Sequence, residues 1–264
     1  MTGTTPNDTL VATDIRKTFR RSNGLFSPAS ETRALKGVSF EVTPGEIFGI
    51  VGESGCGKST LARILVGLEE ADGGSLALGA RTLFGPGAPT VSAVNRGIQM
   101  VFQDPYASLN PRMCVGDAVA EGLAIANVPR AEREERVAET LSLVGLTPQD
   151  ARKYPFQFSG GQRQRICIAR ALVMEPAFLL ADEAVSALDV SVQMQILNML
   201  LDLRDRIGVS IIFITHDISV VDYLCDRVMV VYDGEVVEFG EKTAVLDHPQ
   251  NAYTQRLIQS VPRL

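Results

Sequence analysis

One short segment limits the folds open to this chain more than any other. It fits the pattern of a glycine, four further residues and then Gly-Lys-Ser, and it comprises Gly52, Glu53, Ser54, Gly55, Cys56, Gly57, Lys58 and Ser59. Residues 46–51 before it are apolar with strand character, and residues 60–66 after it are apolar at helical spacing. This order predicts a strand, a loop that binds phosphate, and a helix.

The loop has the chemistry that a nucleotide needs. Its glycines let successive backbone N–H groups point inward at an anion, Lys58 supplies a cation to the outer phosphates, and Ser59 offers a hydroxyl to Mg²⁺. A glycine-rich turn is the alternative, and the pattern would arise by accident in roughly one chain of this length in a hundred. The strand and helix on either side favour nucleotide binding.

Composition argues against several other classes of protein. With 264 residues, 45% of them hydrophobic, the chain can bury a sizeable core. The longest apolar runs, such as residues 211–214, are too short to span a bilayer, and residues 1–8 lack the features of a signal peptide, so we expect a cytoplasmic protein. Four scattered cysteines without a Cys-x-x-Cys pair indicate free thiols. The net charge of −6 argues against binding nucleic acid.

Strands alternate with helices along most of the chain. We expect strands at residues 10–19, 34–42, 46–51, 75–78, 98–102, 178–181, 209–215, 228–232 and 235–239. Helices are expected at residues 131–144, 192–207 and 218–224. Residues 20–30 are polar and predict a surface loop, and Asp233-Gly234 predicts a hairpin turn. The alternation predicts an α/β fold with a mainly parallel sheet.

Two adjacent acids follow the predicted strand at residues 178–181. Because ligands bind at the carboxyl ends of parallel strands, Asp182 and Glu183 are candidates for a nucleotide site. Neighbouring strand side chains point in different directions, so one acid can hold Mg²⁺ through water while the other addresses an attacking water. A pair of solvated carboxylates is the alternative, and the phosphate loop upstream favours the functional interpretation.

A second polar, glycine-bearing segment precedes a predicted helix. It contains Ser159, Gly160, Gly161 and Gln162. Such a segment either caps its own helix or holds a phosphate group, because a helix N-terminus favours anions. Spacing does not decide between these two roles.

These motifs together resemble those of the nucleotide-binding subunit of an ABC transporter, over nearly the whole chain. The motifs stand in family order: Walker A at Gly52 to Ser59, the Q-loop residue Gln103, the signature Ser159 to Gln162, Walker B at Phe178 to Asp182 with Glu183, the D-loop Ser186 to Asp189, and the switch residue His216. Residues 103–112 and 182–193 more narrowly resemble the ATPase subunits of bacterial dipeptide, oligopeptide and nickel importers.

The resemblance implies a P-loop NTPase fold of the ABC ATPase type, in one domain over residues 1–264. Within it, residues 1–103 and 177–241 would form the nucleotide-binding core with an N-terminal antiparallel β subdomain. Residues 104–176 would form a helical subdomain that carries the signature, and residues 242–264 a C-terminal tail.

The resemblance also implies a role for each site residue. Two subunits would sandwich two ATP molecules, each lying between the Walker A residues of one subunit, extended to Thr60, and the partner's signature with its Asp189. Mg²⁺ would be held by Ser59, Gln103 and Asp182. Glu183 would act as general base or water-positioning group, His216 would contact the γ-phosphate, and Gln103 would complete the catalytic set. Phe19 would stack on adenine.

Two of these roles have simpler alternatives. His216 is otherwise a polar cap that follows Thr215, and Phe19 is otherwise a core residue at a strand end.

The implied function is ATP hydrolysis that powers an importer of di- or oligopeptides, on the cytoplasmic side of the inner membrane. The partners would be a second ATPase subunit, a sister chain rather than a copy of this one, two membrane permease subunits, and an external substrate-binding protein that acts through the permease. A nickel or other small-solute importer, an exporter, and a soluble ABC ATPase that acts on nucleic acid or ribosomes are the alternatives. The soluble class usually carries coiled coils, zinc modules or tandem cassettes, and the sequence shows none of these.

Overall fold

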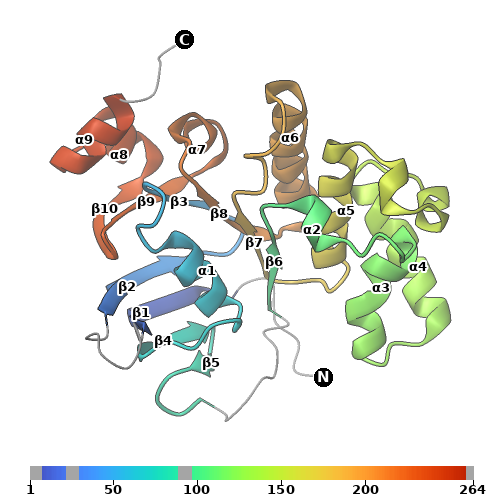
Figure 1. The fold of residues 1–264 in the computed structure, drawn as a ribbon, viewed down its shortest axis with the longest axis horizontal. Helices are drawn as coiled ribbons and strands as arrows, with labels where there is room; N and C mark the ends of the chain where they lie inside the picture. The colour runs from blue at the N-terminus through green and yellow to red at the C-terminus, as the bar shows by residue number, and fades with distance from the viewer. Residues whose placement is uncertain (1–7, 22–29, 89–96, 260–264) are drawn as a thin grey trace. The chain divides into compact units, whose positions relative to one another are not determined.

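The computed structural model describes residues 8–21, 30–88 and 97–259. The chain divides into two compact units, residues 1–95 with 210–264 and residues 96–209 (Figure 1). Each unit contains both strands and helices, so the α/β fold predicted from the alternation of elements is confirmed.

The first unit begins with a four-stranded antiparallel sheet in the order β2-β1-β4-β5. Its strands are β1 (Leu10–Arg21), β2 (Ser30–Val42), β4 (Gly73–Leu78) and β5 (Arg81–Phe84). Alternate residues of β2 are buried, among them Val38, Phe40 and Val42. Period-two burial is typical of a sheet that covers a core on one face, and the sheet confirms the predicted antiparallel β subdomain.

The predicted loop at residues 20–30 is wrong at both ends. Strand β1 continues to Arg21 and β2 already begins at Ser30, so the second strand starts four residues before the predicted position. Arg20 lies opposite Glu31 and forms an ion pair with it at 2.9 Å, and Phe19 lies opposite Thr32. Cross-strand pairs of this kind extend a hairpin through polar sequence. The rest of the predicted loop, residues 22–29, lies outside the described residues.

A second sheet of the first unit carries the phosphate loop. Its strands within this unit are β3 (Ile47–Val51), β8 (Ser210–Thr215), β9 (Arg227–Tyr232) and β10 (Glu235–Glu241). Strands β9, β3 and β8 are parallel, and β10 pairs antiparallel with β9 through the predicted Asp233-Gly234 turn. Every residue of β3 and β8 is buried, and each large apolar side chain buried there contributes about 1.5–3 kcal/mol.

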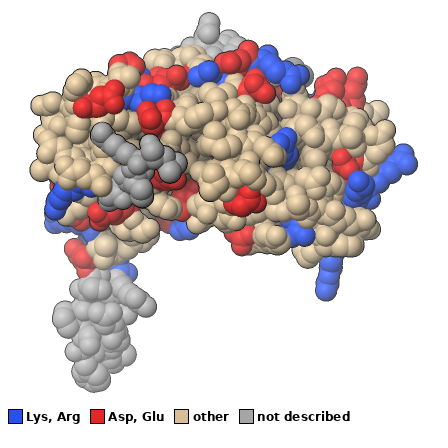
Figure 2. All heavy atoms as spheres, turned by 90° about the horizontal axis from the view of Figure 1, so that it is seen from above, with Lys and Arg blue, Asp and Glu red and all other residues tan. Residues whose placement is uncertain are grey.

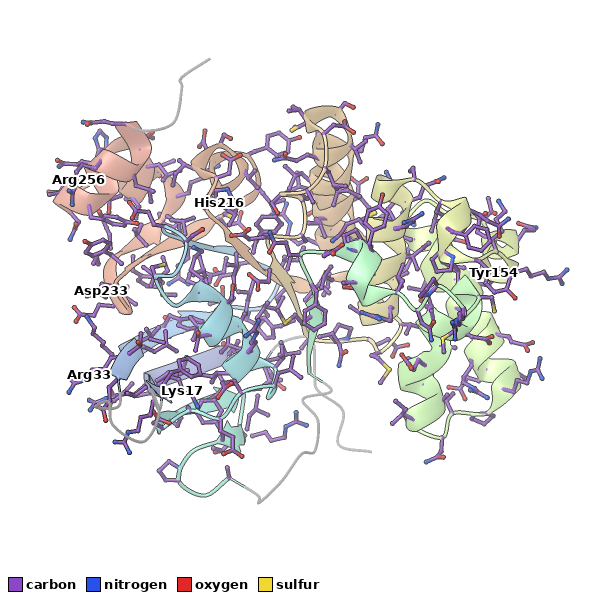
Figure 3. All side chains as sticks on the ribbon, in the orientation of Figure 1. Lys17, Arg33, Tyr154, His216, Asp233 and Arg256 are labelled. Atoms are coloured by element: carbon purple, nitrogen blue, oxygen red, sulfur yellow. The ribbon has the colours of Figure 1, made fainter. Side chains whose placement is uncertain are left out.

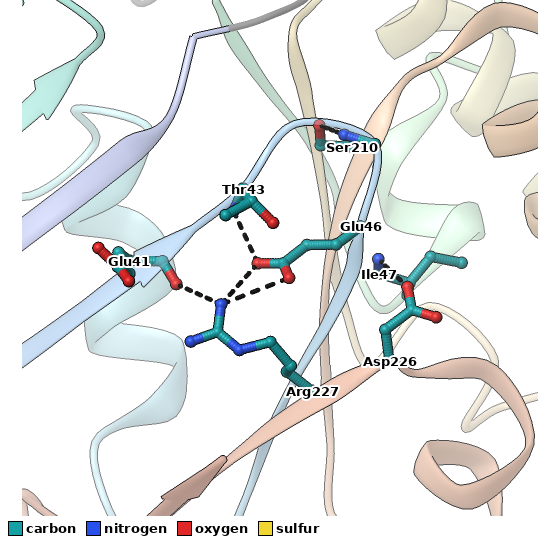
Figure 4. Close-up of polar contacts among 8 residues, drawn as sticks. Glu41, Thr43, Glu46, Ile47, Ser210, Asp226 and Arg227 are labelled. Carbon is teal, nitrogen blue, oxygen red and sulfur yellow. Dashed lines mark hydrogen bonds and ion pairs between the residues drawn. The ribbon is translucent and has the colours of Figure 1, made fainter. Parts of the chain in front are cut away.

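Polar contacts anchor the start of β3 (Figure 4). The Glu46 carboxylate accepts the Thr43 N–H at 2.7 Å and pairs with the Arg227 guanidinium at 3.2 Å. The Ile47 N–H donates to the Asp226 carboxylate at 2.8 Å. Because Glu46 is 9% exposed, its charge needs these partners, and they fix the strand that leads into the phosphate loop.

Four helices complete the described part of the first unit: α1 (Lys58–Leu65), α7 (Ile218–Leu224), α8 (Lys242–Asp247) and α9 (Ala252–Gln259). The chain segment from residue 242 to residue 259 therefore folds as two helices. Both of them contact β10, as Figure 1 shows.

The second unit contains two parallel strands, β6 (Ile98–Val101) and β7 (Phe178–Asp182). Its helices are α2 (Pro105–Ser108), α3 (Val115–Ile125), α4 (Arg130–Leu143), α5 (Gly160–Leu172) and α6 (Val190–Ile207), with 3₁₀ turns at Pro148–Arg152 and Pro155–Gln157. Helix α4 buries Val137 and Leu141, as its helical spacing predicted. Across the residues described, no helix combines the length and apolar character that crossing a bilayer demands.

Candidate functional site

The phosphate loop has the predicted strand, loop and helix. Strand β3 ends at Val51 and helix α1 begins at Lys58. The Lys58 side chain folds back into the loop, where its Nζ donates to the Gly52 carbonyl at 2.6 Å and to the Glu53 carbonyl at 2.8 Å. Lys58 is only 5% exposed, so the loop closes around its ammonium group.

At two positions of the loop only glycine fits, because the backbone of a neighbouring strand lies too close for a Cβ atom. A Cβ atom at Gly52, where φ is +157°, would lie 2.1 Å from the Val231 carbonyl oxygen. A Cβ atom at Gly57, where φ is +110°, would lie 2.4 Å from the Ala34 carbonyl oxygen. Any side chain at either position would displace β9 or β2, because backbone atoms cannot yield as a flexible side chain does.

The residues of the loop differ in their exposure to solvent. Gly52, Cys56, Gly57 and Lys58 are buried, Thr60 is half-buried, and Glu53, Ser54, Gly55 and Ser59 are exposed. The Gly234 N–H of the β9–β10 turn donates to the Cys56 carbonyl at 3.0 Å. Burial raises the pKa of the Cys56 thiol, so this group stays protonated at neutral pH and is a packing element of the loop.

His216 lies at the end of β8 with an exposed side chain (Figure 3). The residue that caps helix α7 is its neighbour Asp217, whose carboxylate accepts the Ser219 N–H at 2.9 Å. The Asp217 N–H in turn donates to the Thr215 hydroxyl at 3.0 Å. The N-cap of α7 is thus Asp217 and not His216, and the contact of His216 with phosphate stays a prediction.

Phe19 lies on β1 with 42% of its surface exposed, so it is not a core residue. The Lys17 Nζ lies 5.3 Å from the centre of the Phe19 ring. An exposed ring is open to stacking, and its contact with adenine stays a prediction.

The second unit brings Gln103, Glu183 and Ser186 together. The Gln103 amide donates to the Glu183 carboxylate at 3.1 Å and to the Ser186 hydroxyl at 3.2 Å, and this hydroxyl donates to the Glu183 carbonyl at 3.0 Å. Glu183 has a φ of +49°, which is uncommon for a residue with a side chain. Asp182, the last residue of the buried strand β7, is 8% exposed.

Sequence reasoning placed Ser186 in the D-loop but missed its contact with Gln103. The three-residue spacing from Glu183 to Ser186 signals only the bond from the Ser186 hydroxyl to the Glu183 carbonyl, because a serine in a turn reaches back to an earlier carbonyl. The contact with Gln103, 83 residues away, has no such local signal.

The signature residues cap their own helix. The Ser159 hydroxyl accepts the Gln162 N–H at 3.3 Å, and the Gln162 side chain accepts the Ser159 N–H at 3.1 Å. This reciprocal pair is a capping box at the start of α5, so the helix-cap interpretation of the segment is confirmed. Its binding of phosphate stays a prediction.

Asp189 caps helix α6. Its carboxylate accepts the Ser191 hydroxyl at 2.7 Å and the Val192 N–H at 3.0 Å. The Ser191 hydroxyl and then the Val192 N–H lower the pKa of Asp189, so the carboxylate is ionised at neutral pH.

The two signature glycines differ in their surroundings, and Gly161→Ala is expected to destabilise the protein. A Cβ atom at Gly161 would lie 2.3 Å from Cγ1 of Val192, whose β-branched side chain has one favoured rotamer on a helix. Overpacking costs about 1–3 kcal/mol and the helix propensity of alanine returns about 1 kcal/mol, so we expect a net loss of up to about 2 kcal/mol. Chemical denaturation measures this loss.

Gly160→Ala is the matched control, because the nearest atoms to its Cβ would lie at 3.7 Å. We expect no loss of stability for this variant. Equal stability of the two variants would contradict the packing role of Gly161.

The donors available for a metal ion fit Mg²⁺ bound together with phosphate. Within the described ranges, no group of three His, Cys, Asp or Glu side chains forms a metal cage. Mg²⁺ at nucleotide sites does not need such a cage, because it takes one or two protein oxygens together with phosphate oxygens and water. Oxygens of this kind are a hydroxyl from Ser59 in the first unit and a carboxylate and an amide oxygen from Asp182 and Gln103 in the second unit, and their joint binding of Mg²⁺ stays a prediction.

The family model described as ABC transporter matches residues 35–186 of this chain. The glutathione import ATP-binding protein GsiA of Pectobacterium atrosepticum is 47% identical over 243 residues, which are 92% of this chain and 39% of that protein. The chain thus spans about two fifths of the length of that relative.

A second relative is the di/tripeptide transport ATP-binding protein DppF of Pseudomonas aeruginosa, 44% identical over 97% of this chain and 79% of that protein. Among solved structures, a dimeric ATP-binding cassette bound to ADP and Pi has a TM-score of 0.74 and 28% identity, over 88% of this chain and 98% of that chain. The family model matches more than half of the chain, and the alignment with DppF covers 97% of the chain and 79% of that protein. The chain therefore belongs to the ABC transporter family.

Proposed function

We propose that this chain is the ATP-binding and ATP-hydrolysing subunit of an ABC importer for di- or oligopeptides. The observation that carries the proposal is the Lys58 ammonium held inside the phosphate loop by two carbonyl groups, at 2.6 and 2.8 Å. Family membership supports the ATPase chemistry. The names of the two relatives, which concern glutathione and di- and tripeptides, support a peptide substrate.

The phosphate loop binds the phosphate chain of ATP in this proposal. Residues Gly52 to Thr60 bind the phosphate groups, with backbone N–H groups of the loop as donors, Lys58 pairs with the outer phosphates, and Phe19 stacks on the base. Ser59, Asp182 and Gln103 hold Mg²⁺, which when bound neutralises charge that develops on the transferred phosphoryl group.

Glu183 is the proposed general base. It accepts a proton from the attacking water or orients that water, and the Gln103 amide, 3.1 Å away, holds the carboxylate in place. His216 contacts the γ-phosphate and helps to orient the water.

A second ATPase subunit completes each site. Ser159, Gly160, Gly161 and Gln162, with Asp189, contact the ATP that the partner subunit holds. The dimeric state of the solved relative, which binds ADP and Pi, supports this arrangement.

The remaining partners are two permease subunits and, through them, an external substrate-binding protein. A groove of about 840 Å³ in the second unit lies among α3, α4 and the turn at residues 148–152, and Asp117, Arg130, Arg133 and Glu134 line it. We propose that it receives a cytoplasmic segment of a permease, which places the chain at the cytoplasmic face of the inner membrane. Acidic and basic side chains are interspersed on the face drawn in Figure 2, which gives no support to a role on nucleic acid.

Purification of the tagged chain from membranes in mild detergent tests this function. We expect two permease subunits and a sister ATPase to co-purify, in amounts equal to that of the chain, and an untagged strain is the control. Recovery with nucleic acid or ribosomes, and without membrane proteins, would contradict the importer assignment. A permease complex that stimulates ATP hydrolysis with nickel and not with peptides would correct the substrate class alone.

A further inference from the structure

A tyrosine near the C-terminal end of the described chain contacts the phosphate loop. Tyr253 lies on α9, the helix that carries the labelled Arg256 in Figure 3, and its side chain is 5% exposed. Its hydroxyl accepts the backbone N–H of Glu53 at 3.0 Å. The two residues are 200 positions apart, so this bond joins the C-terminal segment directly to the loop.

The bond fixes one particular peptide group. The Glu53 N–H belongs to the same peptide unit as the Gly52 carbonyl, and this carbonyl accepts the Lys58 Nζ at 2.6 Å. One peptide plane is therefore held at both ends, by the ammonium of Lys58 and by the hydroxyl of Tyr253. Rotation of this plane would break both bonds at once.

Tyr253 is itself held in place by the sheet. The Glu238 carboxylate of β10 accepts the N–H groups of Gln250 and Asn251 at 2.8 and 3.2 Å, and the Asn251 side chain accepts the Tyr253 N–H at 2.8 Å. The Tyr253 ring packs on the Tyr232 ring of β9 with centres 4.3 Å apart. A continuous path of contacts thus runs from the sheet through the start of α9 to the loop.

We propose that Tyr253 is a positioning residue for nucleotide binding, through which helix α9 holds the Gly52–Glu53 peptide in the orientation that Lys58 requires. The inference rests on the proposed function, since it assigns the C-terminal helix a part in the same ATP site. If the loop is already oriented before ATP binds, less conformational entropy is lost on binding and the affinity for ATP is higher. The hydroxyl acts on the loop and not on the substrate.

The expected effect is moderate, because water can replace the hydroxyl. A cavity of about 300 Å³ lies beside the contact and is lined by Glu53, Tyr232, Tyr253, Arg256 and Leu257. Loss of a single neutral hydrogen bond changes the equilibrium constant that depends on it by about three- to tenfold. We therefore expect Tyr253→Phe to raise the Kd and the KM for ATP by about this factor, with kcat nearly unchanged.

Tyr232→Phe is the matched control. It removes the hydroxyl of the other ring in the pair and leaves both rings in place, so we expect wild-type affinity for ATP. Titration with a fluorescent ATP analogue measures Kd for the wild type, both variants and Lys58→Ala. Amide hydrogen exchange measures the bond itself, and we expect faster exchange at Glu53 in Tyr253→Phe while the core strands keep their protection.

The outcomes separate this inference from the proposed function. If the wild type binds ATP, Lys58→Ala does not, and Tyr253→Phe binds as the wild type does, the positioning role is overturned and the ATP site stands. Equal weakening by Tyr232→Phe also overturns it, because the effect would then belong to the ring pair. A wild type that does not bind ATP overturns both.

Discussion

Glu183→Gln is expected to lower kcat for ATP hydrolysis by about 10²–10⁴-fold while ATP affinity is retained, since this is the usual contribution of a general base. Glutamine keeps the length of the side chain and an oxygen that accepts the Gln103 amide at the observed 3.1 Å, so the local contacts survive. It cannot accept a proton from water. The variant should therefore accumulate in the ATP-bound, closed dimer, and phosphate release under saturating Mg-ATP measures the loss.

Glu175→Gln is the matched control for this variant. Glu175 also lies in the second unit, and its φ of +51° is close to the +49° of Glu183, so both substitutions are made at a positive φ. We expect wild-type hydrolysis from Glu175→Gln. Hydrolysis by Glu183→Gln at the wild-type rate would remove Glu183 from the catalytic role.

Lys58→Ala is expected to weaken ATP binding by at least about 100-fold, because charge-assisted hydrogen bonds to phosphate contribute about 1.5–3 kcal/mol each. The structure adds a second reason. The Lys58 Nζ is the donor to the Gly52 and Glu53 carbonyls, so its removal also loosens the loop that presents the backbone N–H groups. Equilibrium titration with ATP measures the change in Kd.

Lys153→Ala provides the comparison for the charge change alone. Lys153 lies in the second unit, where it pairs with Asp150 at 2.7 Å, and its side chain is 51% exposed. We expect this variant to bind ATP as the wild type does. Unchanged ATP affinity in Lys58→Ala would contradict the identification of the phosphate loop.

Features that depend on local sequence could be predicted. The phosphate loop, the Asp233-Gly234 turn and the apolar face of α4 each follow from a few neighbouring residues, and the structure contains all three. Gly52 is an example. The motif requires glycine at this position, and the structure gives the reason, because the Val231 carbonyl lies too close for any side chain.

Features that depend on contacts between distant residues could not be predicted. The Gln103 amide meets Glu183 80 residues later, and the Glu53 N–H meets Tyr253 200 residues later. No periodicity or spacing encodes such pairs, since the fold alone brings them together. The extension of β1 to Arg21 was missed for a related reason, because the cross-strand partner of Arg20 overrides the low strand propensity of its neighbours.

The decisive measurement is phosphate release from Mg-ATP by the complex that is purified from membranes with this chain, its second ATPase subunit and the permease subunits. The wild type, Lys58→Ala and Glu183→Gln are measured side by side, with and without EDTA. We expect hydrolysis by the wild type that EDTA abolishes and that both variants lack, with ATP still bound by Glu183→Gln. Hydrolysis that persists in EDTA, or that is equal in the wild type and Lys58→Ala, would contradict this expectation.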